Sequence, residues 1–195
     1  TKGLSQYVGL LVGHIYGGTI QNNTVNSSTI NLDYNANNSY ATRIGGLIGN
    51  ANSAAATISK CSVSEITMNN ASRVAAVGGL VGNIEDSATG TTITDSTVSN
   101  SNIYNTYATN TAYSMYIGGA IGRSLASFTA SNVDVSDVNI TAASLVKGAG
   151  CFGGYIAGEA KPSLSHIAFL NFFPLSVAPS LYSSIYFVPF SPSSS

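Results

Sequence analysis

One short pattern recurs along this chain of 195 residues. An aliphatic residue is followed by glycine, three small or aliphatic residues and a further glycine. Five copies, the last of them degraded, occupy 8–13, 44–49, 77–82, 117–122 and 152–158. Their first glycines are 36, 33, 40 and 35 residues apart. Self-similarity with a period of about 20–50 residues is typical of architectures in which each unit covers the next, so the chain is expected to be a stack of repeats.

A second pattern follows each of the first four copies. Two apolar residues five positions apart enclose a small or polar residue, as in Ile58, Cys61 and Val63. The other occurrences are Ile20-Asn23-Val25, Ile93-Ser96-Val98 and Phe128-Ser131-Val133. A third apolar position comes shortly after, at Ile30 with Leu32, Ile66 with Met68, Ile103, and Val138 with Ile140. Each unit therefore contains about three short extended runs separated by turn residues.

These runs predict an all-β fold, a parallel β-helix or β-solenoid of four to five coils over residues 1–160. The units begin near 7, 44, 77, 117 and 152. No run has the length or spacing of an amphipathic helix. A single unit cannot bury its apolar face, but stacked strands about 4.8 Å apart can. The glycine pairs allow a sharp turn and a close approach between neighbouring coils.

Composition supports this reading. Charged residues make up 8% of the chain, whereas a typical soluble domain has about 25%. Ser, Thr, Asn and Tyr take their place, and the first three disfavour helix interiors because their side chains compete for backbone hydrogen bonds. The net charge of −1 gives no basic surface for nucleic acid.

The glycine pattern resembles the GLUG motif, in Gly-Gly-Leu-Ile-Gly at 45–49 and Gly-Gly-Leu-Val-Gly at 78–82. The Ile-x-x-Cys-x-Val run at 58–63 resembles it too. The resemblance covers 7–140 well and 150–158 weakly. It implies a right-handed parallel β-helix of an adhesin-like, extracellular or cell-surface repeat protein. That family also includes the non-catalytic repeat region of IgA-specific metallopeptidases. The resemblance implies a spacer or a binding surface rather than an enzyme.

Three connections are longer than a coil requires, at 33–42, 69–76 and 104–115. Two of them are rich in Tyr, Asn, Ser and Thr, a composition typical of adaptable binding loops. They supply the candidate ligand-binding residues Tyr34, Tyr40, Tyr104, Tyr107 and Tyr113. The two loops occupy the same position in their repeats, so they are expected to emerge on one side. The alternative is that they are ordinary solvated loops.

The function expected from these features is that of a non-catalytic cell-surface or secreted module, a stalk or adhesin that binds a glycan or a protein. One alternative is a structural protein whose open ends stack end to end into filaments. A further alternative is an ice-binding solenoid, which is disfavoured because regular Thr-x-Thr ladders do not recur at matching positions. No cofactor, metal site, nucleic-acid partner or membrane association is expected.

Enzyme chemistry finds no support in the sequence. Asp95 and Asp134 occupy nearly equivalent repeat positions and could stack one coil apart, but no base accompanies them, and isolated carboxylates of this kind are more often turn residues. His14 and His166 belong to no catalytic motif. Cys61 and Cys151 lie in different repeats, with two coils between them, and are expected to be small core residues rather than a disulfide.

Residues 161–195 form an apolar segment rich in Pro and Ser, with no charge after Lys161. Three interpretations stay open: a cap on the last coil, a membrane anchor, or sequence that does not belong to the fold. The repeat is already under way at the first residues, so the chain is expected to be a fragment, a processed product or the translation of a partial gene.

Overall fold

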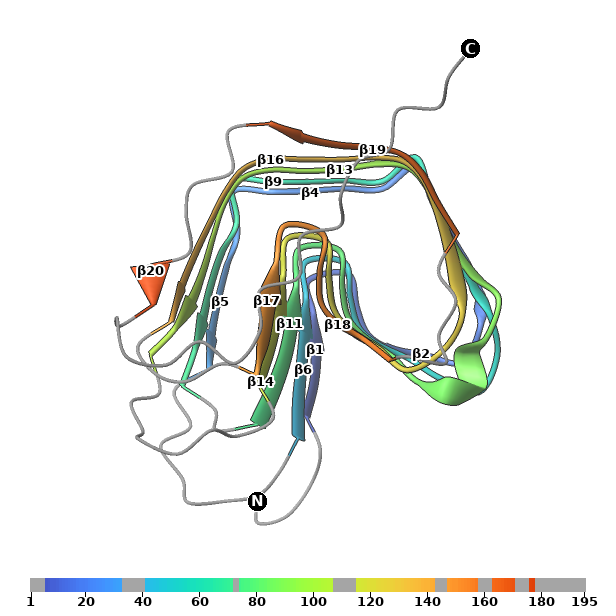
Figure 1. Ribbon diagram of the computed structural model, residues 1–195, viewed down its shortest axis with the longest axis horizontal. Helices are drawn as coiled ribbons and strands as arrows, with labels where there is room; N and C mark the ends of the chain where they lie inside the picture. Colours follow the sequence, from blue (N-terminus) through green and yellow to red (C-terminus); the bar gives the residue numbers. More distant parts are fainter. Residues whose placement is uncertain are drawn as a thin grey trace.

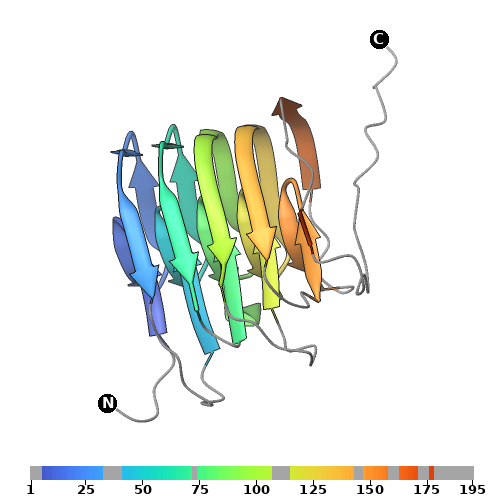
Figure 2. The same cartoon turned by 90° about the vertical axis from the view of Figure 1, so that its left-hand side faces the viewer.

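A computed structural model describes residues 6–32, 41–71, 74–106, 115–142, 147–157, 163–170 and 176–177. These residues form a β-solenoid of parallel strands, with one short 3-10 helix, η1 (Asp86–Ala88) (Figure 1). The all-β solenoid predicted from the repeat is therefore confirmed. Neighbouring units lie side by side as successive layers along the stack (Figure 2).

Three parallel sheets run along the stack, and sheets A and B each contain five strands, one from every repeat. Sheet A contains β1 (Gln6–Gly9), β6 (Ala41–Gly45), β11 (Val74–Gly78), β14 (Met115–Gly118) and β17 (Gly148–Gly150). Sheet B contains β2 (Val12–Ile15), β7 (Ile48–Ala51), β12 (Val81–Ile84), β15 (Ile121–Ser124) and β18 (Gly153–Ile156). The strands of sheet A open the five successive units.

Sheet C contains the remaining strands. In the first two units these are β3 (Gly18–Gln21), β4 (Thr24–Asn26), β5 (Thr29–Leu32), β8 (Ala56–Ser59), β9 (Ser62–Ser64) and β10 (Thr67–Asn70). In the later units they are β13 (Thr91–Asn105), β16 (Phe128–Ala142), β19 (Ser163–Leu170) and β20 (Ser176–Val177). Sheets A and B form a narrow inner wedge, and sheet C wraps around it (Figure 1).

Each unit crosses sheet C in three short segments, which are separate strands in the first two units and continuous in β13 and β16. Two columns of residues with positive φ mark the bends between them. The columns are Asn22, Lys60, Asp95 and Asn132 at the first bend, and Ser27, Glu65, Asn100 and Asp137 at the second. Asn and Asp tolerate this conformation best, which explains why they recur at the bends.

The core is built from columns of apolar side chains on the inner face of sheet C, one column per segment. These are Ile20, Ile58, Ile93 and Ala130; Val25, Val63, Val98 and Val135; and Ile30, Met68, Ile103 and Ile140. The expected alignment of the fourth unit was two residues off, because Ala130 rather than Phe128 stands in register with Ile93. Both residues are buried, so hydrophobicity alone does not distinguish the two registers.

The recurring glycines bring backbone directly against backbone inside the wedge. A Cβ atom on Gly45 would lie 2.0 Å from the carbonyl oxygen of Ile48, and one on Gly82 would lie 2.6 Å from the amide nitrogen of Ile44. No side chain fits between the two sheets at these positions. The first and last glycines of the pattern therefore set how closely sheets A and B approach each other.

The middle glycine lies at the tip of the wedge, where the chain turns from sheet A into sheet B. At Gly79 a Cβ atom would lie 2.1 Å from the carbonyl oxygen of Gly119 in the next unit and 2.6 Å from Cγ1 of Val98. Gly46 and Gly119 have equivalent contacts with Val63 and Val135. The tip therefore packs against the valine column of sheet C, and the three sheets meet there.

The fifth unit has a different register from the one expected. Gly150, not Gly153, pairs with Gly118, and Gly153 pairs with Ile121. The Gly-Gly pair of this unit therefore lies at the start of β18, and Cys151 takes the tip position. A side chain also occupies the tip in the first unit, where Leu10 stands in place of Gly46, so glycine holds the tip in the second, third and fourth units.

Part of the C-terminal segment belongs to the stack. Strand β19 pairs with β16 from Thr129–Ser163 to Ser136–Leu170, and β20 pairs with the end of β16. Residues 163–170 thus supply the sheet C layer of the fifth unit, beyond the expected end of the solenoid at residue 160. Within the described residues, no helix has the length and apolar character needed to cross a membrane.

Cys61 and Cys151 are both free thiols. Cys61 is buried in the core, as expected, and its Sγ lies 3.3 Å from the carbonyl oxygen of Ser59. Cys151 is only half-buried at the tip of the fifth unit, and burial raises the pKa of its thiol. The two residues belong to the second and fifth units.

The tip contact predicts a large difference between two glycine substitutions. Gly79→Ala should lower the free energy of unfolding by about 3 kcal/mol, because its Cβ meets a backbone carbonyl that cannot move alone. Gly153→Ala is the matched control, since its Cβ would meet only the end of the Ile156 side chain at 3.3 Å. Urea denaturation followed by circular dichroism measures both, and equal midpoints would contradict the tip contact.

Candidate functional site

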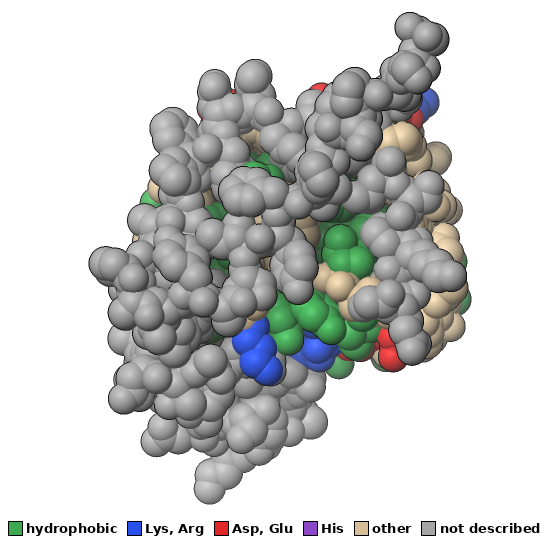
Figure 3. Space-filling view, in the orientation of Figure 1, with side chains coloured by type: hydrophobic (Ala, Val, Ile, Leu, Met, Phe, Trp, Pro, Cys, Tyr) green, Lys and Arg blue, Asp and Glu red, His purple; other side chains and the backbone are tan. Residues whose placement is uncertain are grey.

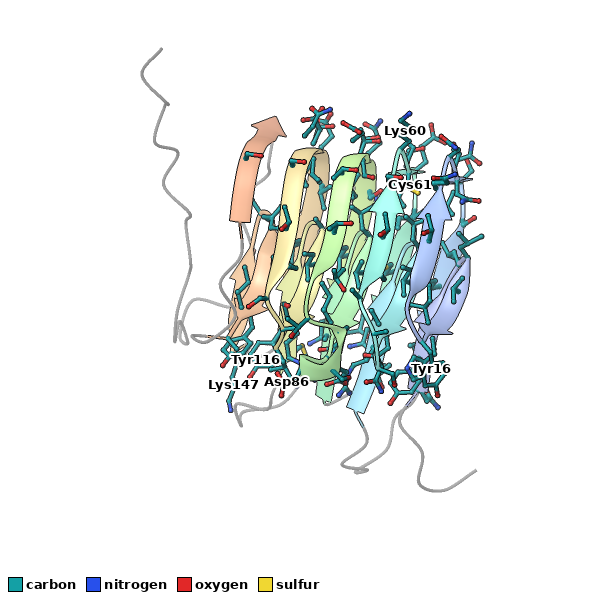
Figure 4. The ribbon with its side chains drawn as sticks, turned by 90° about the vertical axis from the view of Figure 1, so that its right-hand side faces the viewer. Tyr16, Lys60, Cys61, Asp86, Tyr116 and Lys147 are labelled. Atoms are coloured by element: carbon teal, nitrogen blue, oxygen red, sulfur yellow. The ribbon has the colours of Figure 1, made fainter. Side chains whose placement is uncertain are left out.

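Polar and aromatic side chains gather at the base of the wedge, away from the glycine tip. They come from the residues that flank the glycine pattern on either side. Sheet A supplies Tyr7, Arg43 and Tyr116, with Ala76 in the third unit, and sheet B supplies His14, Asn50, Asn83, Arg123 and Tyr155. With Tyr16 and Glu85, these residues are called the polar row. Tyr16 and Tyr116 mark its side of the molecule in Figure 4.

A chain of hydrogen bonds runs along the sheet B half of the row. Arg123 Nε donates to Asn83 Oδ1 at 2.6 Å, and Asn83 Nδ2 donates to Asn50 Oδ1 at 2.7 Å. Asn50 Nδ2 lies 3.3 Å from His14 Nε2. Both asparagines are fully buried, so each bond satisfies a polar group that has left water.

Arg123 fixes the direction of this chain. A guanidinium can only donate, so Asn83 must turn its oxygen toward Arg123 and its amino group toward Asn50. Asn50 is oriented in the same way, and its amino group then faces His14. His14 Nε2 must therefore accept, which places the ring proton of the neutral imidazole on Nδ1.

One carboxylate lies between two guanidinium groups in the middle of the row. Glu85 follows β12, and its oxygens lie 3.5 Å from Arg43 Nη2 and 3.7 Å from Arg123 Nη2. All three side chains are mostly shielded from solvent. Burial and the neighbouring charge of Arg123 lower the pKa of the Arg43 guanidinium below its ordinary value, while Glu85 opposes that shift.

Aromatic rings stand at both ends of the row. At the first unit, the centroid of the His14 ring lies 4.5 Å from that of Tyr7 and 4.3 Å from that of Tyr16. Toward the other end, the rings of Tyr116 and Tyr155 are 4.8 Å apart. Tyr16 is 69% exposed, so this end of the row presents a ring face to solvent.

The polar row is difficult to recognise in the sequence because the residue type at each of its positions changes from unit to unit. The position in sheet A is Tyr, Arg or Ala in different units, and the position in sheet B is His, Asn, Arg or Tyr. A fixed offset is the signal that reveals it: in the register of the sheets, most members of the row stand one place outside the glycine pattern, and Tyr16 and Glu85 stand three places after it.

The predicted tyrosine site is placed only in part. Tyr104 lies on the third segment of β13, in register with Asn69 and Thr141. Tyr34, Tyr40, Tyr107 and Tyr113 lie outside the described residues. The strand ends before the connections, Leu32, Asn70, Asn105 and Ala142, are in register, so the chain leaves sheet C at one edge in every unit.

The two carboxylates considered for catalysis do not stack. Asp134 pairs with Thr97, whereas Asp95 lies at a bend and accepts a hydrogen bond from Asn132 Nδ2 at 2.8 Å. Asp134 lies 39 residues after Asp95, close to the 40-residue spacing of the two glycine patterns, whereas sheet C pairs these units at an offset of 37 residues, which places Asn132 beside Asp95. Among the described residues, no group of three or more His, Cys, Asp and Glu side chains is placed to hold a metal ion.

The outer face of sheet C carries a threonine column that the sequence spacing concealed. Thr19, Thr57, Thr92 and Thr129 stand in register on the first segment. The next outward column contains Gln21, Ser59, Thr94 and Ser131. Only the third unit has threonine in both columns, so these columns contain a single threonine ladder and no regular Thr-x-Thr ladder. The unequal unit lengths obscure the single ladder in the sequence.

No family model, curated protein sequence or solved structure matches this chain.

The hydrogen-bond chain predicts that its central amide matters for stability. Asn83→Leu removes the acceptor of Arg123 and the donor to Asn50, and it should lower the free energy of unfolding by about 2–3 kcal/mol, because buried polar groups lose their partners. The matched control is Asn69→Leu, since Asn69 donates to Asn31 at 2.6 Å on the outer face. That change should cost under about 0.5 kcal/mol. Thermal and urea denaturation measure both, and similar losses would argue against the chain.

Proposed function

We propose that this solenoid is a non-catalytic binding module of a cell-surface or secreted protein, a stalk or adhesin that binds a glycan or a protein. The observation that carries the proposal is the polar row. It places aromatic rings, amides and guanidinium groups in one line through the stack. These groups suit recognition by stacking and hydrogen bonding.

The rigidity of the stack supports a role as a stalk. The strands of sheets A and B stay in parallel register through all five units. Such a repeat array holds its surface side chains at fixed spacing and presents an extended face to a ligand. The outer face of sheet C is mainly Ser, Thr and Asn, and its charged residues among those described are Lys60, Glu65, Asp95, Asp134 and Asp137. It therefore offers a partner hydroxyl and amide groups with a small excess of negative charge.

The loops and the polar row are neighbours along the chain. Sheet A strands begin at Ala41 and Met115, directly after the tyrosine-bearing connections. Arg43 and Tyr116 follow within a few residues. We therefore propose that Tyr34, Tyr40, Tyr104, Tyr107 and Tyr113 act together with the row as one binding side of the stack.

Binding to immobilised glycans and to glycan-bearing cells tests the proposal. The unmodified protein should be retained, and replacing Tyr104, Tyr107 and Tyr113 by serine should reduce retention by at least about tenfold, the loss of roughly one buried aromatic contact. A control with Thr24, Asn26 and Ser62 replaced by alanine alters the middle segment of sheet C and should bind normally. Equal retention of all three proteins would reject a role of the tyrosine-bearing loops in binding. No retention of the unmodified protein would reject glycan binding.

The threonine column favours ice binding as a second candidate function. Its hydroxyl groups repeat at the strand spacing of about 4.8 Å on a sheet face, with a second hydroxyl-rich column beside it. Apolar residues on the opposite face of the sheet hold the columns in place. A fixed two-dimensional array of hydroxyl and methyl groups can order a layer of water.

Thermal hysteresis measures this second candidate directly. The unmodified protein should depress the freezing point without an equal change in the melting point, and Thr92→Tyr should abolish the effect by breaking the flat face. Thr97→Tyr, on the adjacent segment, is the control and should retain it. No hysteresis in the unmodified protein would eliminate ice binding without bearing on glycan recognition.

A further inference from the structure

We infer that the middle of the polar row, formed by Arg43, Glu85 and Arg123, binds the anionic group of a saccharide, a sugar carboxylate or sulfate. This inference rests on the proposed function, because it names the ligand class of the same surface. It is carried by the charge of this cluster, by its unmet hydrogen-bond donors and by the rings beside it.

Positive charge exceeds negative charge at this part of the row. Two guanidinium groups share the single carboxylate of Glu85. Figure 4 shows Lys147 and Asp86 on the same side of the molecule, and their opposite charges add no net charge to it. Figure 3 shows Lys and Arg side chains beside hydrophobic ones, a class that includes Tyr, on the lower part of the end face. The cluster therefore has one unit of positive charge that no described carboxylate offsets.

The donors of the two arginines are far from saturated by Glu85. The separations of 3.5 and 3.7 Å exceed the roughly 2.7–2.9 Å of a strong charge-assisted bond. Arg43 Nε is buried and has no hydrogen-bond partner. An incoming carboxylate or sulfate offers several acceptor oxygens, and the planar guanidinium matches such groups in a bidentate geometry.

Aromatic rings lie next to the charged cluster, which favours a sugar over a bare anion. Tyr155 is in register with Arg123 on the neighbouring strand, and its ring packs at 4.8 Å from that of Tyr116. Both rings are partly exposed. A pyranose ring that packs on these faces brings its ionised substituent within reach of Arg123, while hydroxyl groups meet the remaining donors.

Isothermal titration calorimetry of the full chain tests the inference with defined oligosaccharides. The probes are an oligogalacturonate, a sulfated heparin oligosaccharide and a neutral maltohexaose, with inorganic sulfate and a short single-stranded DNA as non-saccharide anions. At least one anionic oligosaccharide should bind in a salt-dependent manner, and the stronger of the two identifies carboxylate or sulfate. Maltohexaose and inorganic sulfate should bind at least about tenfold more weakly.

Charge variants locate the site. Arg43→Gln and Arg123→Gln should each weaken the anionic saccharide by at least about tenfold, the loss of one charged hydrogen bond. Glu85→Gln should strengthen binding by up to about fivefold, because it removes the competing carboxylate. Lys60→Gln is the matched control, since Lys60 lies on the opposite side of the molecule in Figure 4 and should leave affinity unchanged.

Each outcome separates the inference from the proposed function. Binding of the neutral oligosaccharide alone would overturn the anionic site and leave glycan binding in place. Equal affinity for DNA, or equal loss in Lys60→Gln, would show general attraction of polyanions and overturn the site. Weaker binding of the saccharide by Glu85→Gln, with an unchanged circular dichroism spectrum, would show that Glu85 contacts the ligand. It would contradict the proposal that Glu85 competes with the ligand for the two arginines. Failure of every saccharide would reject the anionic site together with glycan binding by the polar row, and would leave a protein as the ligand of the proposed module.

Discussion

The close approach of two backbones inside the wedge is the interaction on which the rest of the fold depends. Sheets A and B meet through glycines such as Gly45 and Gly82, where a single Cβ atom would collide with main-chain atoms of the opposite sheet. Because the wedge is this thin, sheet C can close around it and bury three apolar columns against it. The tip contact between Gly79 and Val98 then holds the wedge at a fixed depth.

The same constraint determines where functional side chains can occur. At the tip of the second, third and fourth units, glycine leaves no room for a side chain. Toward the base the sheets admit them, and the first positions that do so are those of the polar row. The faces of the wedge that meet sheet C must be apolar, and the outer face of sheet C is uniform and mostly uncharged. Chemical variety between units is therefore concentrated at the base of the wedge.

Much of the fold was predictable from the sequence because glycine and the β-branched residues report backbone geometry directly. The parallel stack and most of the core, including the Ile58 and Val63 columns, followed from the repeat. The registers at Ala130 and Gly150 did not, because neighbouring apolar residues or glycines fit either alignment equally well. Asp95 and Asp134 are 39 residues apart, close to the 40-residue spacing of the glycine patterns, but sheet C pairs these units at an offset of 37 residues. The unequal unit lengths also conceal the threonine column. Contacts between different units, such as those of Glu85 with Arg43 and Arg123, depend on three-dimensional position that spacing alone does not provide.

The direction of the amide chain couples distant parts of the stack. Arg123 alone determines which way Asn83 and Asn50 turn, and thereby which nitrogen of His14 can accept. The chain spans three strand spacings, about 14 Å. A ligand that drew Arg123 Nε away from Asn83 would free both amides to reverse, and the ring at the first unit could then donate instead of accept. Occupancy near the fourth unit would thus be transmitted to the exposed aromatic end by the reorientation of two buried side chains, without any movement of the backbone.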